Sequence, residues 1–252
     1  MLIVVFPPSE AATIPLGAMT SAVGLYQRLG LPLPWHPATS PIPLIIYGAA
    51  SAVGSYAIQL AQLSNIHPLI CVAGRGIKHV ESLIDKSKGD MIVDYRSGDE
   101  SVVGGLREAA KQAGKLEYAF DAVSEKGSYV NICEVLDRQT GQITLVLPGK
   151  DYAEIPSTVR KSWTKCGMVF QAMDDDPWEK KVGTKTGNKE FGYVMFRLFG
   201  RGLARGWFKG QPYEVVPGGL NGVEGALTKL KEGKASAVKY VFRIADTPGL
   251  QR

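Results

Sequence analysis

Short runs of apolar residues alternate with longer stretches of helical periodicity through the middle of the chain. The first run, residues 44–47, reads as a buried strand and leads directly into a turn of small residues. Because each run is separated from the next by a stretch that reads as a helix, the pattern predicts an α/β fold with a doubly wound parallel sheet. The expected strands are residues 44–47, 69–73, 91–95, 116–123 and 142–147.

Helices are expected between these strands, where apolar residues recur at intervals of three and four positions. One helix begins near Val53 and places Ala57 and Leu60 on a face that would lie against the sheet. Two further apolar faces are formed by Val102, Val103, Leu106 and Ala110, and by Tyr129, Ile132, Cys133 and Leu136.

The pattern differs toward both ends of the chain. A helix and a proline-rich linker precede the first strand, and an irregular polar region follows Pro148 and Gly149. Residues 174–176, three consecutive aspartates in that region, are expected to form a solvated loop rather than a cation site. The expected outer elements are helices at 20–29, 189–207 and 220–230, a linker at 31–43 and a final strand at 239–244.

The composition is that of a globular protein. With 252 residues, of which 45% are hydrophobic, the chain can bury one large core or two small ones. Its apolar start, residues 2–6, is too short for a signal peptide, and no stretch approaches the length of a membrane span. The widely separated Cys71, Cys133 and Cys166 suit reduced thiols, which predicts a cytoplasmic location.

Charge and metal-ligating residues narrow the function classes. The formal net charge is +5, but Lys and Arg are dispersed and form no basic stripe, so nucleic acid is not expected as a partner. The three cysteines and three histidines show no ligand spacing with one another, so no metal site is expected either.

The turn after the first strand carries the main chemical signal. Aligned on Gly54, it reads Ala49-x-Ser51-x-x-Gly54 in place of G-x-G-x-x-G, with Gly48 one position earlier for the tight turn. The amide groups and dipole at the start of the following helix attract phosphate, and small side chains let it approach. A dinucleotide pyrophosphate is therefore expected at Ser51, Ala52, Val53 and Gly54; the alternative is a small-residue turn of any α/β protein.

The end of the second strand indicates which dinucleotide is bound. An acidic residue about 20 positions beyond the glycine turn binds the ribose hydroxyl of NAD, whereas a basic residue favours the 2′-phosphate of NADP. Arg75 occupies that position, with Lys78 one helical turn further on. A guanidinium can hold phosphate through two hydrogen bonds, so NADPH is the expected cofactor; the alternative is an ordinary surface arginine.

Further residues at the ends of strands are candidates for the same site. Tyr95 ends the third strand at the carboxyl edge and could cover the adenine or touch the 2′-phosphate. Leu147 and Pro148 end another strand at that edge, where backbone groups could meet the nicotinamide amide. Asp121 could cap a turn or take part in catalysis, and these two interpretations stay open.

With these residues in hand, the chain resembles the medium-chain dehydrogenase/reductase superfamily, and within it the zinc-independent fungal branch of trans-acting enoyl reductases and ToxD-like proteins. The resembling segments run over nearly the whole chain and are specific in combination. They are residues 11–15, 29–32, 48–54, 93–96, 120–123, 217–220 and 233–239.

The resemblance implies NADPH-dependent reduction of an α,β-unsaturated thioester that the acyl carrier domain of a polyketide synthase or hybrid synthase presents. It implies no residue as a secure proton donor, so the catalytic residues stay unknown. The cofactor residues it implies are Ser51, Ala52, Val53, Gly54, Gly74, Arg75, Gly76, Ile77, Tyr95, Leu147, Pro148, Val238 and Lys239. The substrate-facing residues it implies are Thr20, Ser21, Met168, Val169 and Phe170.

The resemblance also implies a division into domains. Relatives carry a GroES-like domain, on the order of 100 residues, ahead of the segment at 11–15, and most of it is expected to be missing here. Residues 1–42 would be the end of that domain and a linker, 43–218 a Rossmann domain with an irregular insert, and 219–252 a helix and strand returning to the substrate domain.

Two alternative functions stay open on the sequence. A quinone or enone oxidoreductase of the same superfamily would share the hydride chemistry. A truncated, non-catalytic NADPH-binding protein would keep the cofactor residues and lack the activity.

Overall fold

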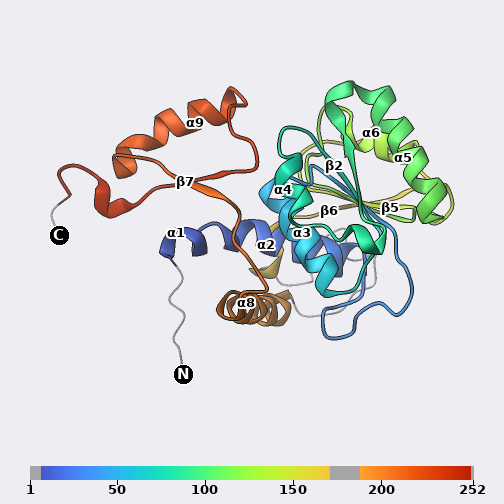
Figure 1. Ribbon diagram of the computed structural model, residues 1–252, viewed down its shortest axis with the longest axis horizontal. Helices are drawn as coiled ribbons and strands as arrows, with labels where there is room; N and C mark the ends of the chain where they lie inside the picture. The colour runs from blue at the N-terminus through green and yellow to red at the C-terminus, as the bar shows by residue number, and fades with distance from the viewer. Residues whose placement is uncertain (1–6, 171–187, 251–252) are drawn as a thin grey trace.

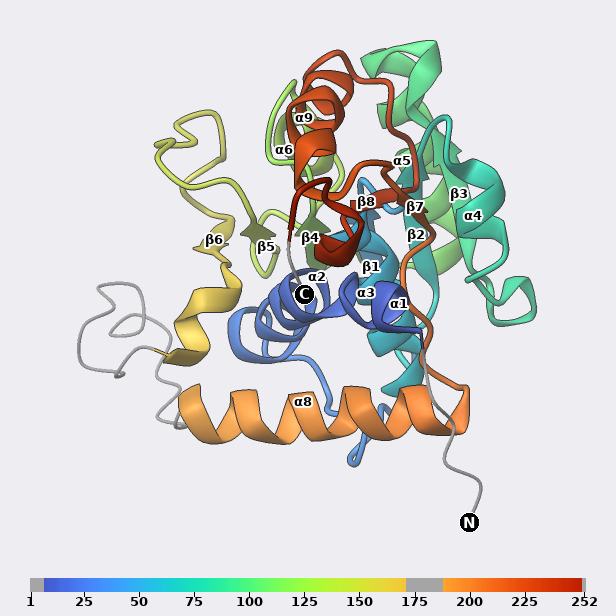
Figure 2. The same ribbon diagram turned by 90° about the vertical axis from the view of Figure 1, so that its left-hand side faces the viewer.

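The computed structural model describes residues 7–170 and 188–250. Residues 174–176, expected to form a loop, lie outside these ranges. A six-stranded parallel sheet with strand order β3-β2-β1-β4-β5-β6 lies at the centre of the fold, with helices on both faces (Figures 1 and 2). The strands are β1 (Leu44–Tyr47), β2 (Leu69–Ala73), β3 (Met91–Asp94), β4 (Tyr118–Asp121), β5 (Gln142–Leu145) and β6 (Arg160–Trp163).

The expected doubly wound sheet is thus confirmed, and its topology follows from the residues of β1. All four are buried, with Leu44 and Ile46 in the core on one face of the sheet and Ile45 and Tyr47 in the core on the other. Successive side chains of a strand point to opposite faces, so a strand that is apolar at every position must be covered on both. The strand order reverses between β1 and β4, which places a crevice at their carboxyl ends.

Helices on one face of the sheet form a core around Phe120 and Tyr56, and those on the other face form a core around Leu106 and Ile132. The first group is α2 (Ile14–Ala22), η1 (Val23–Arg28), α3 (Ala52–Leu63) and α4 (Ile77–Glu81). The second is α5 (Asp99–Ala113) and α6 (Ser128–Cys133); the short turns η2 (Lys86–Lys88) and η3 (Tyr95–Ser97) flank β3.

The helix expected at residues 20–29 begins earlier, at Ile14, after the short α1 (Pro8–Ala11). Pro15 lies in the first turn of α2, where its missing N–H is not needed, so the proline starts this helix instead of breaking it. Its last six residues, η1, are wound as a π-helix. The Ser21 hydroxyl donates to the backbone carbonyl of Val53 at 2.7 Å, which ties α2 to the start of α3.

The C-terminal part of the chain forms a layer beneath the sheet and a projecting lobe. The helix α8 (Asn188–Arg205) packs on α2 and on η4 (Cys166–Phe170), and runs along the bottom of Figure 2. The parallel pair β7 (Tyr213–Val215) and β8 (Lys239–Val241), with α9 (Val223–Lys231), projects at the left of Figure 1. The short turns η6 (Gly219–Gly222) and η7 (Ile244–Asp246) complete this lobe.

Two strands, β6 and β7, were not expected from the sequence. Four expected strands are shorter than predicted: β3, β4, β5 and β8. β6 has a single buried residue, Ser162, because it is an edge strand, so it shows no apolar run. β7 has three residues and none of them is buried. The strand expected at 239–244 ends at Val241, after its pairing with β7 stops.

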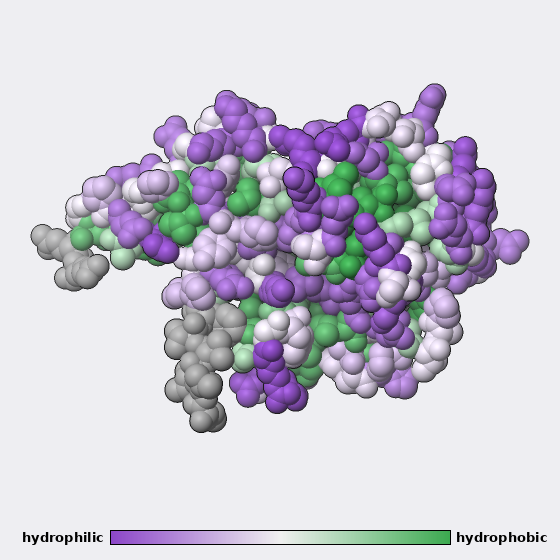
Figure 3. Space-filling view, viewed as in Figure 1, coloured by the Kyte–Doolittle hydropathy of each residue, from purple (hydrophilic) through white to green (hydrophobic). Residues whose placement is uncertain are grey.

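Polar side chains cover much of the face shown in Figure 3, with apolar patches between them, one of which lies on the lobe at the left. Among the described helices, none combines the length and the apolar character needed to cross a lipid bilayer.

Candidate cofactor cleft

The turn between β1 and α3 has the geometry of an anion-binding helix start. Ser51 is the N-cap residue of α3, and its Oγ accepts a hydrogen bond from the Gly54 amide at 3.0 Å. Gly48 has a φ of +75°, which glycine adopts freely, and its carbonyl accepts from the Ser51 amide at 2.8 Å. The next amide groups at the start of α3 therefore face the carboxyl end of β1, where a phosphate would be held.

Gly54 allows this turn to close against the helix. A Cβ at residue 54 would lie 2.3 Å from the Gly48 carbonyl oxygen and 2.7 Å from the Ala49 Cα. Both are backbone atoms that cannot move aside. The glycine at this position is thus required by close packing, the role of the last glycine in a dinucleotide-binding turn.

A cleft of about 430 Å³ opens in front of this turn. Its size lies within the range of roughly 300–1,000 Å³ that is usual for ligand sites. It is lined from the ends of β1, β2 and β3, from the loop after β4, and from the segment between α9 and β8. The lining residues are Tyr47, Gly48, Ala50, Ser51, Ala73, Gly74, Arg75, Gly76, Tyr95, Asp99, Val123, Glu125, Lys126, Ala235, Ser236 and Ala237.

The floor of the cleft is shaped by two more glycines. A Cβ at Gly74 would lie 2.5 Å from the Tyr95 ring, so the ring, 44% exposed, lies directly against the backbone there. A Cβ at Gly76 would lie 2.4 Å from the Ala50 side chain. These cradles and the α3 N-terminus fit a dinucleotide, because a flat aromatic surface and exposed backbone amides suit an adenosine and a pyrophosphate respectively.

Arg75 is exposed at the edge of this cleft, and one Nη2–H donates to the carbonyl oxygen of Gly233 at 2.5 Å. The carboxylate at the end of β3, Asp94, is paired with Arg96, whose Nη2 lies 2.5 Å from it. That pair holds the pKa of Asp94 below its usual value. Arg75, at the end of β2, thus contributes a cation to the lining of the cleft.

Asp121 caps a turn. Its carboxylate accepts from the backbone amides of Val123 and Ser124, at 3.0 and 2.9 Å, and from the Ser128 hydroxyl at 2.6 Å. Burial raises the pKa of this carboxyl. Since three donors inside the protein hold its oxygens, the first of the two open interpretations describes the residue.

The structure separates several expected cofactor residues from the cleft. Leu147 and Pro148 line another cavity, of about 270 Å³, between the end of β5 and β6, and the Leu147 carbonyl accepts from the Tyr152 hydroxyl at 2.5 Å. Val238 and Lys239 follow the three cleft-lining residues 235–237. The Lys239 amide donates to Pro212, and burial lowers the pKa of its side chain.

The expected substrate residues lie on the opposite side of β1, around α2 and η4. The Thr20 hydroxyl donates to the Leu16 carbonyl at 2.7 Å, within its own helix. Met168 is buried and its sulfur accepts from Arg28, and Val169 packs against Gly192 of α8. Of the five expected residues, Ser21 is fully buried, and Phe170, 72% exposed, is the one open to solvent.

The sequence analysis missed the residues that enter the cleft from loops. Lys126 and Ala237 have positive φ values, +52° and +53°, although neither is a glycine. Asp99 starts α5, and its carboxylate accepts from Asn131 at 2.8 Å. Asp99 and Lys126 carry no periodicity and no motif. Ala237 lies in the resembling segment 233–239, but no cofactor contact was expected from it.

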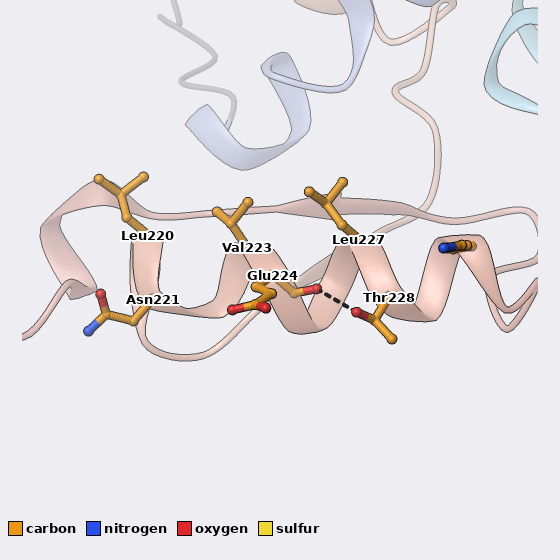
Figure 4. Close-up of a pocket in the computed structure, with 7 residues that line it drawn as sticks. Leu220, Asn221, Val223, Glu224, Leu227 and Thr228 are labelled. Atoms are coloured by element: carbon orange, nitrogen blue, oxygen red, sulfur yellow. Dashed lines mark hydrogen bonds between the residues drawn. The ribbon is translucent and has the colours of Figure 1, made fainter.

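A shallower hollow lies on the projecting lobe (Figure 4). Leu220, Val223 and Leu227 point to one side of η6 and α9, while the Thr228 hydroxyl donates to the Glu224 carbonyl at 3.0 Å. This apolar row has none of the glycine cradles of the cleft. Among the described residues, no group of three or more His, Cys, Asp or Glu side chains could hold a metal ion.

The sheet defines a protein of the Rossmann-like α/β class, with a cleft at the point where the strand order reverses. No family model matches the sequence. The chain is 50% identical over 215 residues to the trans-enoyl reductase fsr4 of Gibberella fujikuroi, covering 84% of this chain and 59% of that protein. It is 28% identical over 237 residues to the trans-enoyl reductase ACTTS2 of Alternaria alternata, covering 93% of this chain and 64% of that protein.

Solved structures agree on the fold. The enoyl reductase cyclopropanase CurF of the curacin A biosynthetic pathway superposes with a TM-score of 0.63 at 18% identity, over 94% of this chain and 63% of that one. The alcohol dehydrogenase of the hyperthermophilic archaeon Aeropyrum pernix gives a TM-score of 0.65 at 16% identity, over 92% of this chain and 57% of that one.

The chain is thus a relative of the fungal trans-enoyl reductases, with the fold of the medium-chain dehydrogenase/reductase superfamily, and the resemblance drawn from its motifs is confirmed. Proteins of this group use a nicotinamide cofactor. The chain spans about three fifths of the length of the curated relatives it matches.

Proposed function

We propose that this chain is the cofactor-binding part of an NADPH-dependent trans-acting enoyl reductase. The observation that carries the proposal is the 50% identity to a trans-enoyl reductase over 215 residues. The cleft in front of the turn between β1 and α3 supports it, because its size suits a ligand. The reaction proposed is the reduction of an α,β-unsaturated thioester on the carrier domain of a polyketide synthase. NADPH, when bound, supplies the hydride for the β-carbon, and a proton is added at the α-carbon.

The roles proposed for the residues follow the shape of the cleft. The amides of Ala52 and Val53, at the start of α3, would hold the pyrophosphate. Tyr95 would cover the adenosine from its place against Gly74. Arg75 would bind the 2′-phosphate, which supports NADPH over NADH.

Roles are also proposed for expected residues that do not line the cleft. Val238 and Lys239 directly follow the lining residues 235–237, and the Lys239 ammonium is proposed as a partner of the pyrophosphate. Leu147 and Pro148 offer backbone groups for the nicotinamide amide from the end of β5. Phe170 is the residue of the substrate set that is open to solvent and can meet an acyl chain.

We also propose the division of the chain at residues 42 and 218, with the Rossmann domain between. The six-stranded sheet falls entirely within 43–218, and α9 and β8 fall within 219–252. A cytoplasmic location is proposed because Cys71, Cys133 and Cys166 are all free thiols, as expected in a reducing compartment.

Nicotinamide fluorescence titration tests the cofactor proposal. The chain is expected to bind NADPH more tightly than NADH, and Arg75→Ala is expected to weaken NADPH binding by roughly tenfold or more with little effect on NADH. Equal weakening of both cofactors would contradict a 2′-phosphate contact, and binding of neither would contradict the cofactor role itself.

The substrate proposal is tested by NADPH oxidation with the chain supplied alongside the remaining part of a full-length relative. Turnover of a carrier-bound enoyl thioester supports the proposal. Preference for a small quinone would assign the protein to the quinone and enone oxidoreductases. Tight NADPH binding without turnover of either substrate would assign it a non-catalytic role.

A further inference from the structure

The Arg75 guanidinium is held by a backbone group from a distant part of the chain. Its Nη2–H donates to the Gly233 carbonyl oxygen at 2.5 Å, across 158 positions of sequence. Arg75 follows β2 in the Rossmann sheet, whereas Gly233 ends α9 in the projecting lobe. The two parts of the fold therefore meet at the residue that we propose as the selector of the cofactor.

The Gly233 carbonyl is itself fixed in place. Gly233 has a φ of +67°, and its amide donates to the Leu230 carbonyl at 3.0 Å, which closes the last turn of α9. The next amide, of Lys234, donates to Lys229 at 2.9 Å. Gly233 follows the C-cap residue of α9, and its backbone carbonyl, like any other, is an acceptor that a guanidinium can bind.

The segment that follows Gly233 forms one wall of the cleft. Ala235, Ser236 and Ala237 all line it, and a Cβ on Gly76 would come within 3.1 Å of the Ala237 side chain. The nearby Glu232 carboxylate is paired with Lys234 at 2.6 Å. The backbone carbonyl of Gly233 is thus the acceptor that the structure gives to the Arg75 side chain.

This hydrogen bond restricts the motion of the Arg75 side chain but uses only part of its hydrogen-bonding capacity. A guanidinium has five N–H donors in a planar fork, and a single donor is used here. A free arginine side chain samples many rotamers, and ordering it on a ligand opposes binding. Holding the guanidinium at one Nη2–H in advance lowers this entropy cost and keeps other donors available for an anion in the cleft, which Arg75 lines.

We propose that Gly233 is a positioning residue for cofactor selectivity. Its carbonyl holds the Arg75 guanidinium at the mouth of the cleft, ready for the 2′-phosphate of NADPH. The inference rests on the proposed NADPH preference and extends it, because it makes the lobe of α9 and β8 a determinant of which dinucleotide binds.

Gly233→Ala is the variant that tests this, because alanine disfavours the left-handed conformation and displaces the carbonyl. Gly206→Ala is the matched control. Gly206, at the end of α8, also has a positive φ, +75°, and its amide likewise donates three residues back, to Leu203 at 3.0 Å. Around both glycines, the described residues leave open space for a Cβ.

The measurement is the ratio of NADPH to NADH dissociation constants from fluorescence titration, with thermal unfolding recorded for each variant. Gly233→Ala is expected to lower the preference for NADPH by roughly three- to tenfold, the size of one ordinary hydrogen bond. Gly206→Ala is expected to leave the ratio unchanged. In an Arg75→Ala background, Gly233→Ala is expected to have no further effect on the ratio.

The inference would be overturned if Gly233→Ala and Gly206→Ala gave the same ratio of NADPH to NADH dissociation constants. The proposed function would stay intact if Arg75→Ala still lost the NADPH preference. In that case Arg75 merely caps α9. A wild-type chain without NADPH preference would overturn the proposed function first. Should Gly233→Ala not fold, nitrogen NMR relaxation of the Arg75 side chain in the cofactor-free wild-type chain replaces it: an ordered guanidinium supports the inference, and a freely rotating one overturns it.

Discussion

Gly54→Ala is the most direct test of the turn geometry. The added methyl group would lie 2.3 Å from the Gly48 carbonyl oxygen and 2.7 Å from the Ala49 Cα. Contacts of carbon with other heavy atoms are optimal near 3.5–4.0 Å, so the turn must open by more than an ångström. That movement displaces the amides at the start of α3.

The expected loss of stability in Gly54→Ala follows from the rigidity of the backbone around residue 54. Overpacking a core by one methyl group costs about 1–3 kcal/mol, and the upper part of that range applies because backbone atoms are struck. For a chain of this length, each kcal/mol lowers the Tm by roughly 2–4 °C. A fall in Tm of roughly 4–12 °C is therefore expected, with loss of NADPH binding even at temperatures where the variant is folded.

Gly104→Ala is the matched control. Gly104 lies within α5, and the described residues leave open space around its Cβ position. Alanine is better than glycine inside a helix by about 1 kcal/mol, so this variant is expected to raise the Tm and to keep its cofactor binding. Calorimetry and fluorescence titration measure both quantities. A Gly54→Ala variant with wild-type Tm and wild-type NADPH affinity would refute the packing argument.

Two further predictions concern groups outside the cleft. Asp90→Ala is expected to lower the free energy of unfolding by about 1–3 kcal/mol in urea titrations, because it removes the acceptor of the buried Leu69 amide and the partner of His67 Nδ1, which lies 2.7 Å from the carboxylate. A change below roughly 0.5 kcal/mol would contradict this. The Asp137 carboxyl accepts from the amides of Thr140 and Gln139, which lower its pKa to about 2. Because the folded protein lowers this pKa, Asp137 stabilises the fold at pH values above its ordinary pKa of about 4, and this stabilisation is lost as the pH falls toward about 2. An NMR titration that finds an ordinary pKa for Asp137 would be inconsistent with these hydrogen bonds.

How much could be predicted from the sequence depended on burial. The strands β1 and β2 are buried at every position, so their apolar runs were visible and the parallel sheet could be inferred. β6, at the edge, has one buried residue in four, and β7 has none in three, so neither gave a signal. The first long helix was expected at residues 20–29, and α2 begins earlier, at Ile14, with Pro15 in its first turn.

Part of the cleft could be predicted from the sequence, because some of its residues belong to a local motif. Ser51 and Arg75 could be placed because a turn motif and a fixed distance along the chain locate them, and both line the cleft. Gly54 lies in the same turn, at the start of α3. Ser236 and Ala237 belong to a loop whose conformation is set by contacts made far away in sequence. Neither periodicity nor spacing within the chain reveals such a wall.

The wall formed by residues 235–237 has a consequence for the order of folding. Tyr47 and Ala237 line the same cleft although 190 positions separate them. Bringing such distant segments together costs roughly 4–5 kcal/mol of chain entropy beyond the constant of loop closure. During synthesis, the sheet can form while this wall is still unmade, so the cleft is completed late. A dinucleotide that contacts both the sheet and residues 235–237 would then stabilise the association of the part of the chain that folds first with the part that folds last.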